Sequence, residues 1–213
     1  MKFKKEMLRL YAVTDRRWIG KRTLYEQIED ALSGGVTLVQ LREKELSEKE
    51  FTEEAVQIRE LCHRYGVPLI INDSVEVALK SGADGVHVGM EDTPVKEIRN
   101  RAGQKFIIGA TAKTVDQAKA AEEAGADYLG VGAVFASPTK KNAIRITPGQ
   151  LKEICSSVSI PAVAIGGISL ENAAEIQGCG MNGIAVVSAI FAADDIKAAA
   201  AELKKKVEMM GIS

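Results

Sequence analysis

Charged and polar side chains that suit a phosphate group follow a short apolar run near residue 40. The sequence there reads Gln40-Leu41-Arg42-Glu43-Lys44. Alternate residues of an extended chain point to the same side, so Gln40, Arg42 and Lys44 share one face. Arginine and lysine on one face favour an anion, because both donate charge-assisted hydrogen bonds to phosphate oxygens. A solvated charged loop is the alternative that this motif alone leaves open.

Two carboxylates follow the next two apolar runs. Asp73 comes directly after Asn72, and Asp92 lies shortly after the run that contains His87. Carboxylates, together with waters and substrate phosphates, are the usual ligands of Mg²⁺. We therefore expect Asp73 and Asp92 to hold Mg²⁺, with helix N-capping as the alternative for each of them. We interpret His87 as a structural histidine, since it lies among apolar residues.

Hydroxyl groups, a lysine and glycines end the later apolar runs. Thr111 follows one run, and Ser137-Pro138-Thr139-Lys140 belongs to a long loop after the next. A loop of that length is typical of a functional lid, although a flexible basic loop is the alternative. Gly166-Gly167 and Val187-Ser188 end the last two runs. Glycine-rich turns before a short helix bind phosphate through backbone N–H groups, so this pair predicts a monophosphate site.

These residues follow eight apolar runs of four to seven residues, at 8–13, 37–41, 68–71, 85–88, 106–110, 128–134, 162–165 and 183–187. Such runs are typical of strands buried on both faces. The segments between them, such as 49–65, 115–124 and 196–209, repeat apolar residues at spacings of three and four, which indicates helices. Eight units without a linker predict one domain over 1–213, a closed (β/α)₈ TIM barrel rather than an open doubly wound sheet.

Composition excludes several other classes of protein. The net charge of −1 gives no general attraction to nucleic acid or to anionic membranes. The sequence has no long apolar run and no apolar leader after Met1, so we expect a cytoplasmic protein with small-molecule substrates. The three cysteines lack CxxC spacing and indicate free thiols. The oligomeric state stays open, a homodimer included.

The combined motifs resemble the thiamine-phosphate synthase family. The resemblance covers nearly the whole chain from Leu10 onward and is carried by QLREK at 40–44, Asn72-Asp73, His87-Val88-Gly89 with Asp92, Gly109 with Thr111, SPTK at 137–140, AIGGI at 164–168 and VSAI at 187–190. It implies a TIM-barrel transferase that joins a pyrimidine diphosphate to a thiazole phosphate. In the family pyrophosphate leaves first, and the thiazole nitrogen captures a pyrimidine-methyl cation.

The resemblance also implies a role for each site residue. The pyrimidine diphosphate would contact Gln40, Leu41, Arg42, Glu43, Lys44, Asn72, Thr111 and Lys140. The thiazole phosphate would contact Ser137, Pro138, Thr139, Gly167, Val187 and Ser188. Mg²⁺ would bind Asp73 and Asp92. Catalysis would depend on Arg42, Lys44, Lys140 and Thr111, because the first step requires neutralisation of the leaving group.

The chain departs from the family pattern at several positions. Met90 replaces a usual glutamine, Thr111 a serine, Lys113 a common histidine, Ala133 a frequent proline and Ser137 a frequent threonine. None of these changes removes an acid, a base or a metal ligand. We therefore expect them to affect substrate affinity more than activity.

Two other functions compete with this interpretation. The thiazole tautomerases are barrels of the same superfamily, but they carry a histidine where this chain has Ala133 and lack the full QLREK motif and aspartate pair. A non-catalytic phosphate-binding barrel would have lost Asp73, Asp92 or Lys140, and all three are present. The sequence therefore favours the synthase.

Overall fold

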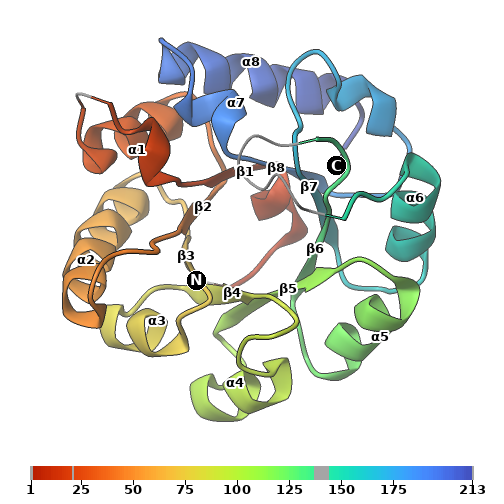
Figure 1. The fold of residues 1–213 in the computed structure, drawn as a ribbon, viewed down its shortest axis with the longest axis horizontal. Helices are drawn as coiled ribbons and strands as arrows, with labels where there is room; N and C mark the ends of the chain where they lie inside the picture. The colour runs from red at the N-terminus through yellow and green to blue at the C-terminus, as the bar shows by residue number, and fades with distance from the viewer. Residues whose placement is uncertain (1, 21, 137–143, 213) are drawn as a thin grey trace.

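Eight parallel strands form a closed barrel in chain order, β1 to β8 (Figure 1). The computed structural model describes residues 2–20, 22–136 and 144–212. The strands are β1 (Leu10–Val13), β2 (Leu38–Leu41), β3 (Leu69–Asn72), β4 (Gly85–Val88), β5 (Ile107–Ala112), β6 (Tyr128–Gly132), β7 (Ala162–Ile165) and β8 (Gly183–Val186). The β1–β8 pairing closes the sheet, so the predicted (β/α)₈ TIM barrel is confirmed.

Helices surround the barrel on its outer side (Figure 1). They are α1 (Leu24–Ser33), α2 (Glu48–Arg64), α3 (Val75–Ser81), α4 (Val95–Ala102), α5 (Val115–Glu123), α6 (Pro148–Ser156), α7 (Ser188–Phe191) and α8 (Ile196–Met209), with short 3-10 helices η1 (Lys5–Leu8), η2 (Arg16–Trp18) and η3 (Ala173–Ile176). Within the described part of the chain, no helix is long and apolar enough to cross a membrane.

Helix starts are fixed by side chains that satisfy the free N–H groups of the first turn. Thr23, Ser47 and Thr147 begin α1, α2 and α6 with capping boxes, each completed by a Glu or Gln three residues later. These caps end the loops that leave the carboxyl ends of β1, β2 and β6. The caps therefore fix the residues at which α1, α2 and α6 begin.

One strand is longer than its apolar run predicts. The run ends at residue 110, but β5 continues to Ala112 because Thr111 pairs with Gly130 of β6. Thr111 therefore lies inside β5, one residue beyond the apolar run. A polar residue at that place is compatible with a strand, since its side chain lines a cavity that opens at this end of the barrel.

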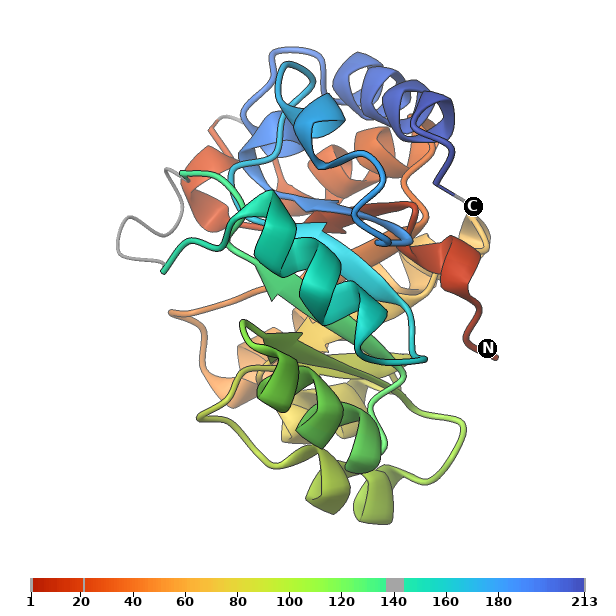
Figure 2. The same ribbon diagram turned by 90° about the vertical axis from the view of Figure 1, so that its right-hand side faces the viewer.

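The inside of the barrel is packed at its amino-terminal end. Leu8 and Tyr11 are buried there with residues of the other strands, and the ring of Phe3 stacks on that of Tyr128 at 5.8 Å between centroids. Figure 2 shows the N-terminal segment at the side of the barrel away from the loops that follow the strands. The described residues thus close this end, and the opposite end is left for the site.

Two glycines make room for the largest rings inside the barrel. A Cβ atom on Gly109 of β5 would collide with the Tyr128 ring and with Nδ1 of His87. A Cβ atom on Gly130 of β6 would approach Cε1 of His87 to 2.8 Å. Aromatic and imidazole rings therefore occupy space that side chains on β5 and β6 would otherwise fill.

Gly109→Ala should lower the free energy of unfolding by about 1–3 kcal/mol, because the added methyl group overpacks the barrel interior. Chemical denaturation measures the difference. Gly149→Ala in α6 is the matched control, since its Cβ would meet its nearest neighbour, Oγ1 of Thr147, at an ordinary 3.8 Å. Equal stability of the two variants would contradict the crowding of Tyr128 and His87.

Candidate active site

A cavity opens at the carboxyl ends of the strands. Of the residues predicted from the sequence, it brings together Gln40, Arg42, Asn72, Thr111, Gly167, Val187 and Ser188. These residues come from β2, β3 and β5 and from the segments that follow β7 and β8. Residues far apart in the sequence thus surround one space, as active sites of this fold do.

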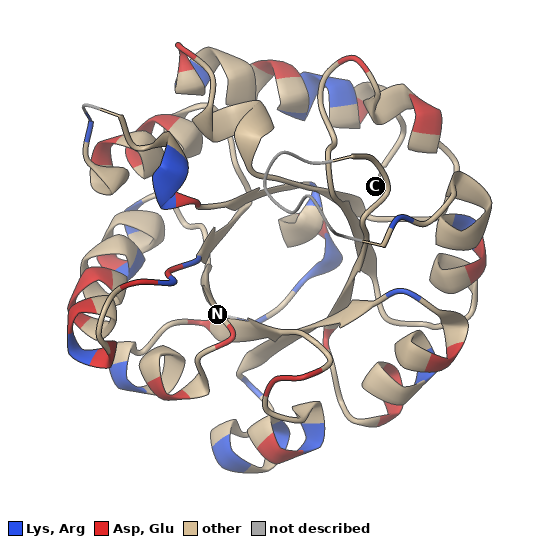
Figure 3. Ribbon diagram, in the orientation of Figure 1, with Lys and Arg blue, Asp and Glu red and all other residues tan. Residues whose placement is uncertain are grey.

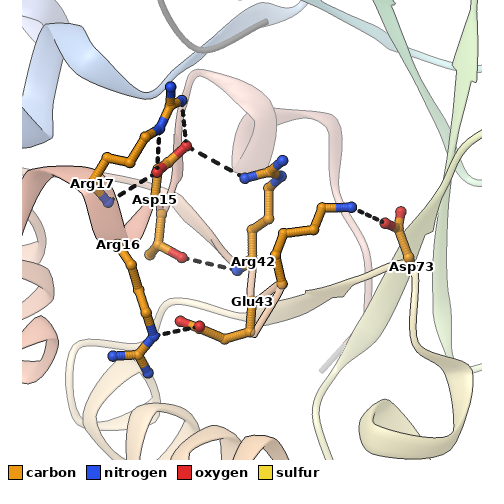
Figure 4. A network of polar contacts seen from close by, with 8 residues as sticks. Asp15, Arg16, Arg17, Arg42, Glu43 and Asp73 are labelled. Atoms are coloured by element: carbon orange, nitrogen blue, oxygen red, sulfur yellow. Dashed lines mark hydrogen bonds and ion pairs between the residues drawn. The ribbon is translucent and has the colours of Figure 1, made fainter. Parts of the chain in front are cut away.

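Arg42 is held at the rim by the end of β1. Its Nη1 lies 3.4 Å from Oδ2 of Asp15, and its backbone N–H donates to Oγ1 of Thr14 at 2.9 Å (Figure 4). Hydrogen bonds from Arg17 hold the pKa of Asp15 below its usual range, so this buried carboxylate is charged. The sequence analysis did not identify Asp15 as a site residue. Its position at the carboxyl end of the first apolar run was the available signal.

Alternation on β2 directs Leu41 and Glu43 away from the cavity. Leu41 is buried in the core between the barrel and the helices. The Glu43 side chain is 1% exposed and accepts a hydrogen bond from Nε of Arg16 at 2.5 Å (Figure 4). Contact of either residue with a substrate would therefore involve its backbone.

Glu43 is the buried member of a cluster of one arginine and two carboxylates. Arg16 also donates from Nη2 to Oε1 of Glu54 at 2.6 Å, which draws β1, β2 and α2 together. Burial raises the pKa of Glu43 to about 7, and the charge of Glu54 adds to this while Arg16 opposes it. The backbone between Arg42 and Lys44 is thereby fastened from the side opposite the cavity.

Lys44 and the two aspartates form a second group beside the cavity. Nζ of Lys44 lies 3.4 Å from Oδ2 of Asp73 (Figure 4). Asp73 has a φ of +63° and is the one non-glycine residue with positive φ among those described. Its N–H donates to the carbonyl of His87 at 2.9 Å. This hydrogen bond extends the β3–β4 pairing by one residue beyond β3. The left-handed backbone conformation of Asp73 then turns the chain toward α3.

Helix capping does not explain either aspartate. Ser74 caps α3 by accepting from the Val77 N–H, and Pro94 precedes α4 without a side-chain cap. Asp92 instead accepts from the Gly89 N–H at 2.7 Å, so its carboxylate is fixed across a tight turn. The N-cap alternative is thus replaced by a turn contact at Asp92 and by a pair with Lys44 at Asp73.

The two aspartates suit a divalent cation. Burial, followed by the charge of Asp92, raises the pKa of Asp73, while Lys44 opposes the shift only in part. A carboxylate whose ionised form is disfavoured by a neighbouring carboxylate is stabilised by a cation that binds both. Among the described residues no group of three or more His, Cys, Asp or Glu gathers in this way, so a cation here would need ligands from water or substrate.

A row of hydrogen bonds crosses the floor of the cavity. Nε2 of Gln40 donates to the Tyr11 hydroxyl at 2.6 Å, and the hydroxyls of Tyr11 and Tyr128 lie 2.8 Å apart. Nδ1 of His87 is 3.1 Å from the Tyr128 hydroxyl, and Nε2 is 3.1 Å from Oγ1 of Thr111. His87 therefore lines the cavity as well as supporting the barrel, and it connects two predicted site residues.

The ends of β7 and β8 leave backbone exposed to the cavity. Gly166 and Gly167 have φ angles of +104° and +63°, and a Cβ atom on Gly167 would collide with the carbonyl of Ala136. Ser188 begins the short helix α7 directly after Val187. The close approach of two backbone segments requires glycine here. Of the other predicted residues, Ser137, Pro138, Thr139 and Lys140 lie outside the described residues.

Lys113 also lines the cavity, although the sequence analysis treated it only as a departure from the family pattern. It lies two residues after Thr111, on the same side of an extended chain, and its N–H donates to Oε1 of Gln117 at 2.8 Å. The alternation of β5 was therefore a sufficient signal. Elsewhere, charges of both signs are spread over the outer helices (Figure 3).

Glu43→Gln should change how stability depends on pH. A folded-state pKa of about 7, above the ordinary 4.5, means that the native protein loses stability as pH rises from about 4.5 to 7. The variant has no carboxyl group to ionise and does not lose this stability. The difference in free energy of unfolding between the variant and the native protein should therefore shift by about 2 kcal/mol in favour of the variant from pH 5 to pH 8. Denaturation at both pH values measures it. Glu45→Gln, at an exposed position two residues on, is the control, and an equal gain there would contradict the burial effect.

The sequence matches one family of known proteins along most of its length. The family model for thiamine monophosphate synthase matches residues 10–190. A thiamine-phosphate synthase of Clostridium botulinum is 44% identical over 201 residues, which cover 94% of this chain and 94% of that protein. The thiamine-phosphate synthase of Ruminiclostridium cellulolyticum is 47% identical over 194 residues, covering 91% of this chain and 92% of the relative.

Solved structures agree with the sequence comparisons. A thiamine phosphate pyrophosphorylase from Pyrococcus furiosus superposes with a TM-score of 0.90 at 40% identity, over 97% of this chain and 98% of that one. A 3-hexulose-6-phosphate synthase superposes with a TM-score of 0.68 at 15% identity, over 93% of this chain and 99% of that one, and shares the fold alone. The chain belongs to the thiamine monophosphate synthase family.

Proposed function

We propose that this transferase of thiamine biosynthesis condenses 4-amino-2-methyl-5-(diphosphooxymethyl)pyrimidine with a thiazole phosphate, giving thiamine phosphate and pyrophosphate. The observation that carries the proposal is the asymmetry of the rim. Arg42, Lys44 and the Asp73–Asp92 pair lie on one side, and the glycine-rich ends of β7 and β8 lie on the other. A metal-bound diphosphate suits the first side and a monophosphate suits the second.

The pyrimidine diphosphate fits the side formed by β2, β3 and β5. Arg42 and Lys44 would hold the diphosphate oxygens, and Gln40, Asn72 and Thr111 offer hydrogen bonds to the ring. Four of these five residues line the cavity, and Lys44 stands at its edge beside Asp73. The family resemblance adds Lys140 as a contact from the loop after β6.

Asp73 and Asp92 are the residues that would hold Mg²⁺. Bound there, the ion would neutralise charge on the diphosphate and complete its ligand shell with diphosphate oxygens. The raised pKa of Asp73 supports this, because the pair is left with more negative charge than Lys44 balances. The chain's own cations, Arg42 and Lys44, would then bind the remaining diphosphate oxygens.

The reaction begins with cleavage of the bond between the pyrimidine methylene carbon and the bridging diphosphate oxygen. Both electrons of that bond leave with the oxygen, so charge develops where Arg42 and Lys44 can stabilise it. The lone pair of the thiazole nitrogen then forms the new carbon–nitrogen bond. Apolar side chains of Val163 and Ile165 line the cavity and would exclude water, which would otherwise react with the pyrimidine-methyl cation.

The thiazole phosphate fits the ends of β7 and β8. Gly167, Val187 and Ser188 line the cavity and would bind its phosphate through backbone N–H groups and a hydroxyl. The resemblance adds Ser137, Pro138 and Thr139. Carboxythiazole phosphate and hydroxyethylthiazole phosphate are both candidate acceptors, and the carboxythiazole would in addition lose its carboxyl group as carbon dioxide. Ala133 also lines the cavity, and this apolar residue stands where the tautomerases carry a histidine.

Asp73→Asn should stabilise the metal-free protein at neutral pH. Since burial and Asp92 raise the pKa of Asp73, its ionisation costs the folded state stability as pH rises through that pKa. In EDTA the variant should therefore unfold at a higher temperature than the native chain at pH 7.5, with no advantage below about pH 3.5, where the unfolded aspartate is protonated too.

Mg²⁺ should reverse that order by raising the Tm of the native protein more than that of Asp73→Asn. Asp116→Asn, an exposed change in the first turn of α5, is the control and should respond to Mg²⁺ as the native chain does. Equal Mg²⁺ responses of the native protein and Asp73→Asn would exclude Asp73 as a ligand.

The reaction itself is tested by mixing the protein with both substrates and Mg²⁺ and following thiamine phosphate and pyrophosphate by chromatography. We expect the two products in equal amounts. Arg42→Ala should lower kcat/KM for the pyrimidine diphosphate by about 100-fold, because charge on the leaving group loses a donor. Arg101→Ala, which breaks an exposed pair with Glu76 on the outer helices, should retain native rates. No product above an enzyme-free control would refute the proposed function.

A further inference from the structure

The hydrogen bonds beneath the cavity form one continuous row. They run from Gln40 through Tyr11, Tyr128 and His87 to Thr111, and thus join β2, β1, β6, β4 and β5. Only the two ends of the row are residues assigned above to the pyrimidine. The three rings between them have no role in the bond-making and bond-breaking steps.

The available protons determine which group donates and which accepts in each hydrogen bond of the row. Since Nε2 of Gln40 donates to the Tyr11 oxygen, the single Tyr11 proton is directed to the Tyr128 oxygen 2.8 Å away. The Tyr128 proton is then directed to Nδ1 of His87, which must be unprotonated to accept it. Nε2 of His87 carries the ring proton and donates to Oγ1 of Thr111.

The two ends of the row therefore differ in what they can offer a ligand. Gln40 donates one of its two amide N–H groups to Tyr11, which fixes the orientation of the amide and therefore the side on which its carbonyl oxygen can accept from a bound molecule. Thr111 accepts from His87, which leaves its own hydroxyl proton as the donor. Both residues line the cavity.

We propose that Tyr11, Tyr128 and His87 are positioning residues that fix Gln40 as an acceptor and Thr111 as a donor, and so select an aminopyrimidine over an oxopyrimidine. The inference rests on the function proposed above. A 4-aminopyrimidine presents its exocyclic N–H to the Gln40 carbonyl and a ring nitrogen to the Thr111 hydroxyl. The 4-oxo analogue replaces that N–H donor with a carbonyl acceptor and would leave the Gln40 acceptor unpaired.

The packing holds this row in place. Tyr128 is fully buried and Tyr11 is 1% exposed, and their rings meet edge to face at 6.0 Å. The imidazole of His87 lies 5.5 Å from the Tyr128 ring. Gly109 and Gly130 provide the space for these rings. Burial also raises the pKa of both phenols, so each keeps the proton that the row requires.

The first experiment reads the direction of the row without any substrate. The chain has two histidines, and His63→Gln removes the other one. In that variant, labelled with ¹⁵N-histidine, two-bond ¹H–¹⁵N correlation should show His87 protonated at Nε2 and unprotonated at Nδ1. Tyr128→Phe should remove this preference. Protonation at Nδ1, or at both nitrogens, would overturn the proposed direction.

The second experiment tests selectivity. We compare kcat/KM for the 4-aminopyrimidine diphosphate with that for its 4-oxo analogue, both with the same thiazole phosphate. Tyr128→Phe cuts the row in its middle and should reduce the amino-to-oxo preference by about tenfold, the ratio expected from one uncharged hydrogen bond. KM for the thiazole phosphate should stay unchanged.

Tyr65→Phe is the matched control, because it removes the hydroxyl that contacts Oγ of Ser33 on the outer helices. Its preference should equal that of the native chain. If Tyr128→Phe slowed both substrates by the same factor, the row would be structural only and the proposal would fail.

The two experiments separate failure of this inference from failure of the proposed function. If neither pyrimidine reacts with the native protein, the proposed function fails whatever the NMR result. If the aminopyrimidine reacts but His87 is protonated at Nδ1, the function stands and the positioning role is refuted.

Discussion

Closure of eight parallel strands gives each strand residue only two directions, into the barrel or toward the surrounding helices. On β2 and the two residues after it, this separates Gln40 and Arg42, which line the cavity, from Leu41 and Glu43, which do not. The outward residues are then used to fasten the inward ones. Glu43 bonds to Arg16, while Leu41 packs against the helices. One short motif thus supplies both the binding face and its support.

The charges of the site are arranged in pairs that leave each cation partly free. Arg42 contacts Asp15 at 3.4 Å, and Lys44 contacts Asp73 at the same distance. Distances of this length are weak contacts, and they restrain the side chains without consuming all their donors. Both cations therefore keep donors free for the diphosphate oxygens that the proposed reaction would place beside them. By contrast, the shorter Arg16–Glu43 contact lies away from the cavity and has a structural role.

Sequence pattern was sufficient for the barrel and for several of the residues that line the cavity. Alternation and position after each apolar run placed Gln40, Arg42 and Asn72 at the cavity, because these properties are local. The Tyr11–Tyr128 contact joins residues 117 apart, and Arg16 reaches Glu43 across 27. Both contacts form only because closure of the sheet brings β1 and the segment after it close to β2 and β6. A local sequence pattern does not reveal such an arrangement. The apolar run at 106–110 stops short of Ala112, where β5 ends, because the pairing of Thr111 with Gly130 is also nonlocal.

The closed amino-terminal end of the barrel has a further consequence. Phe3 stacks on Tyr128, and Leu8 is buried beside them, so this end offers a ligand no passage through the described residues. In the function proposed above, both substrates and both products would then share one entrance at the carboxyl ends of the strands. A heterocycle bound at Gln40 and Thr111 would have to enter before a second ligand filled that entrance, so the proposed reaction would bind its two substrates in a fixed order.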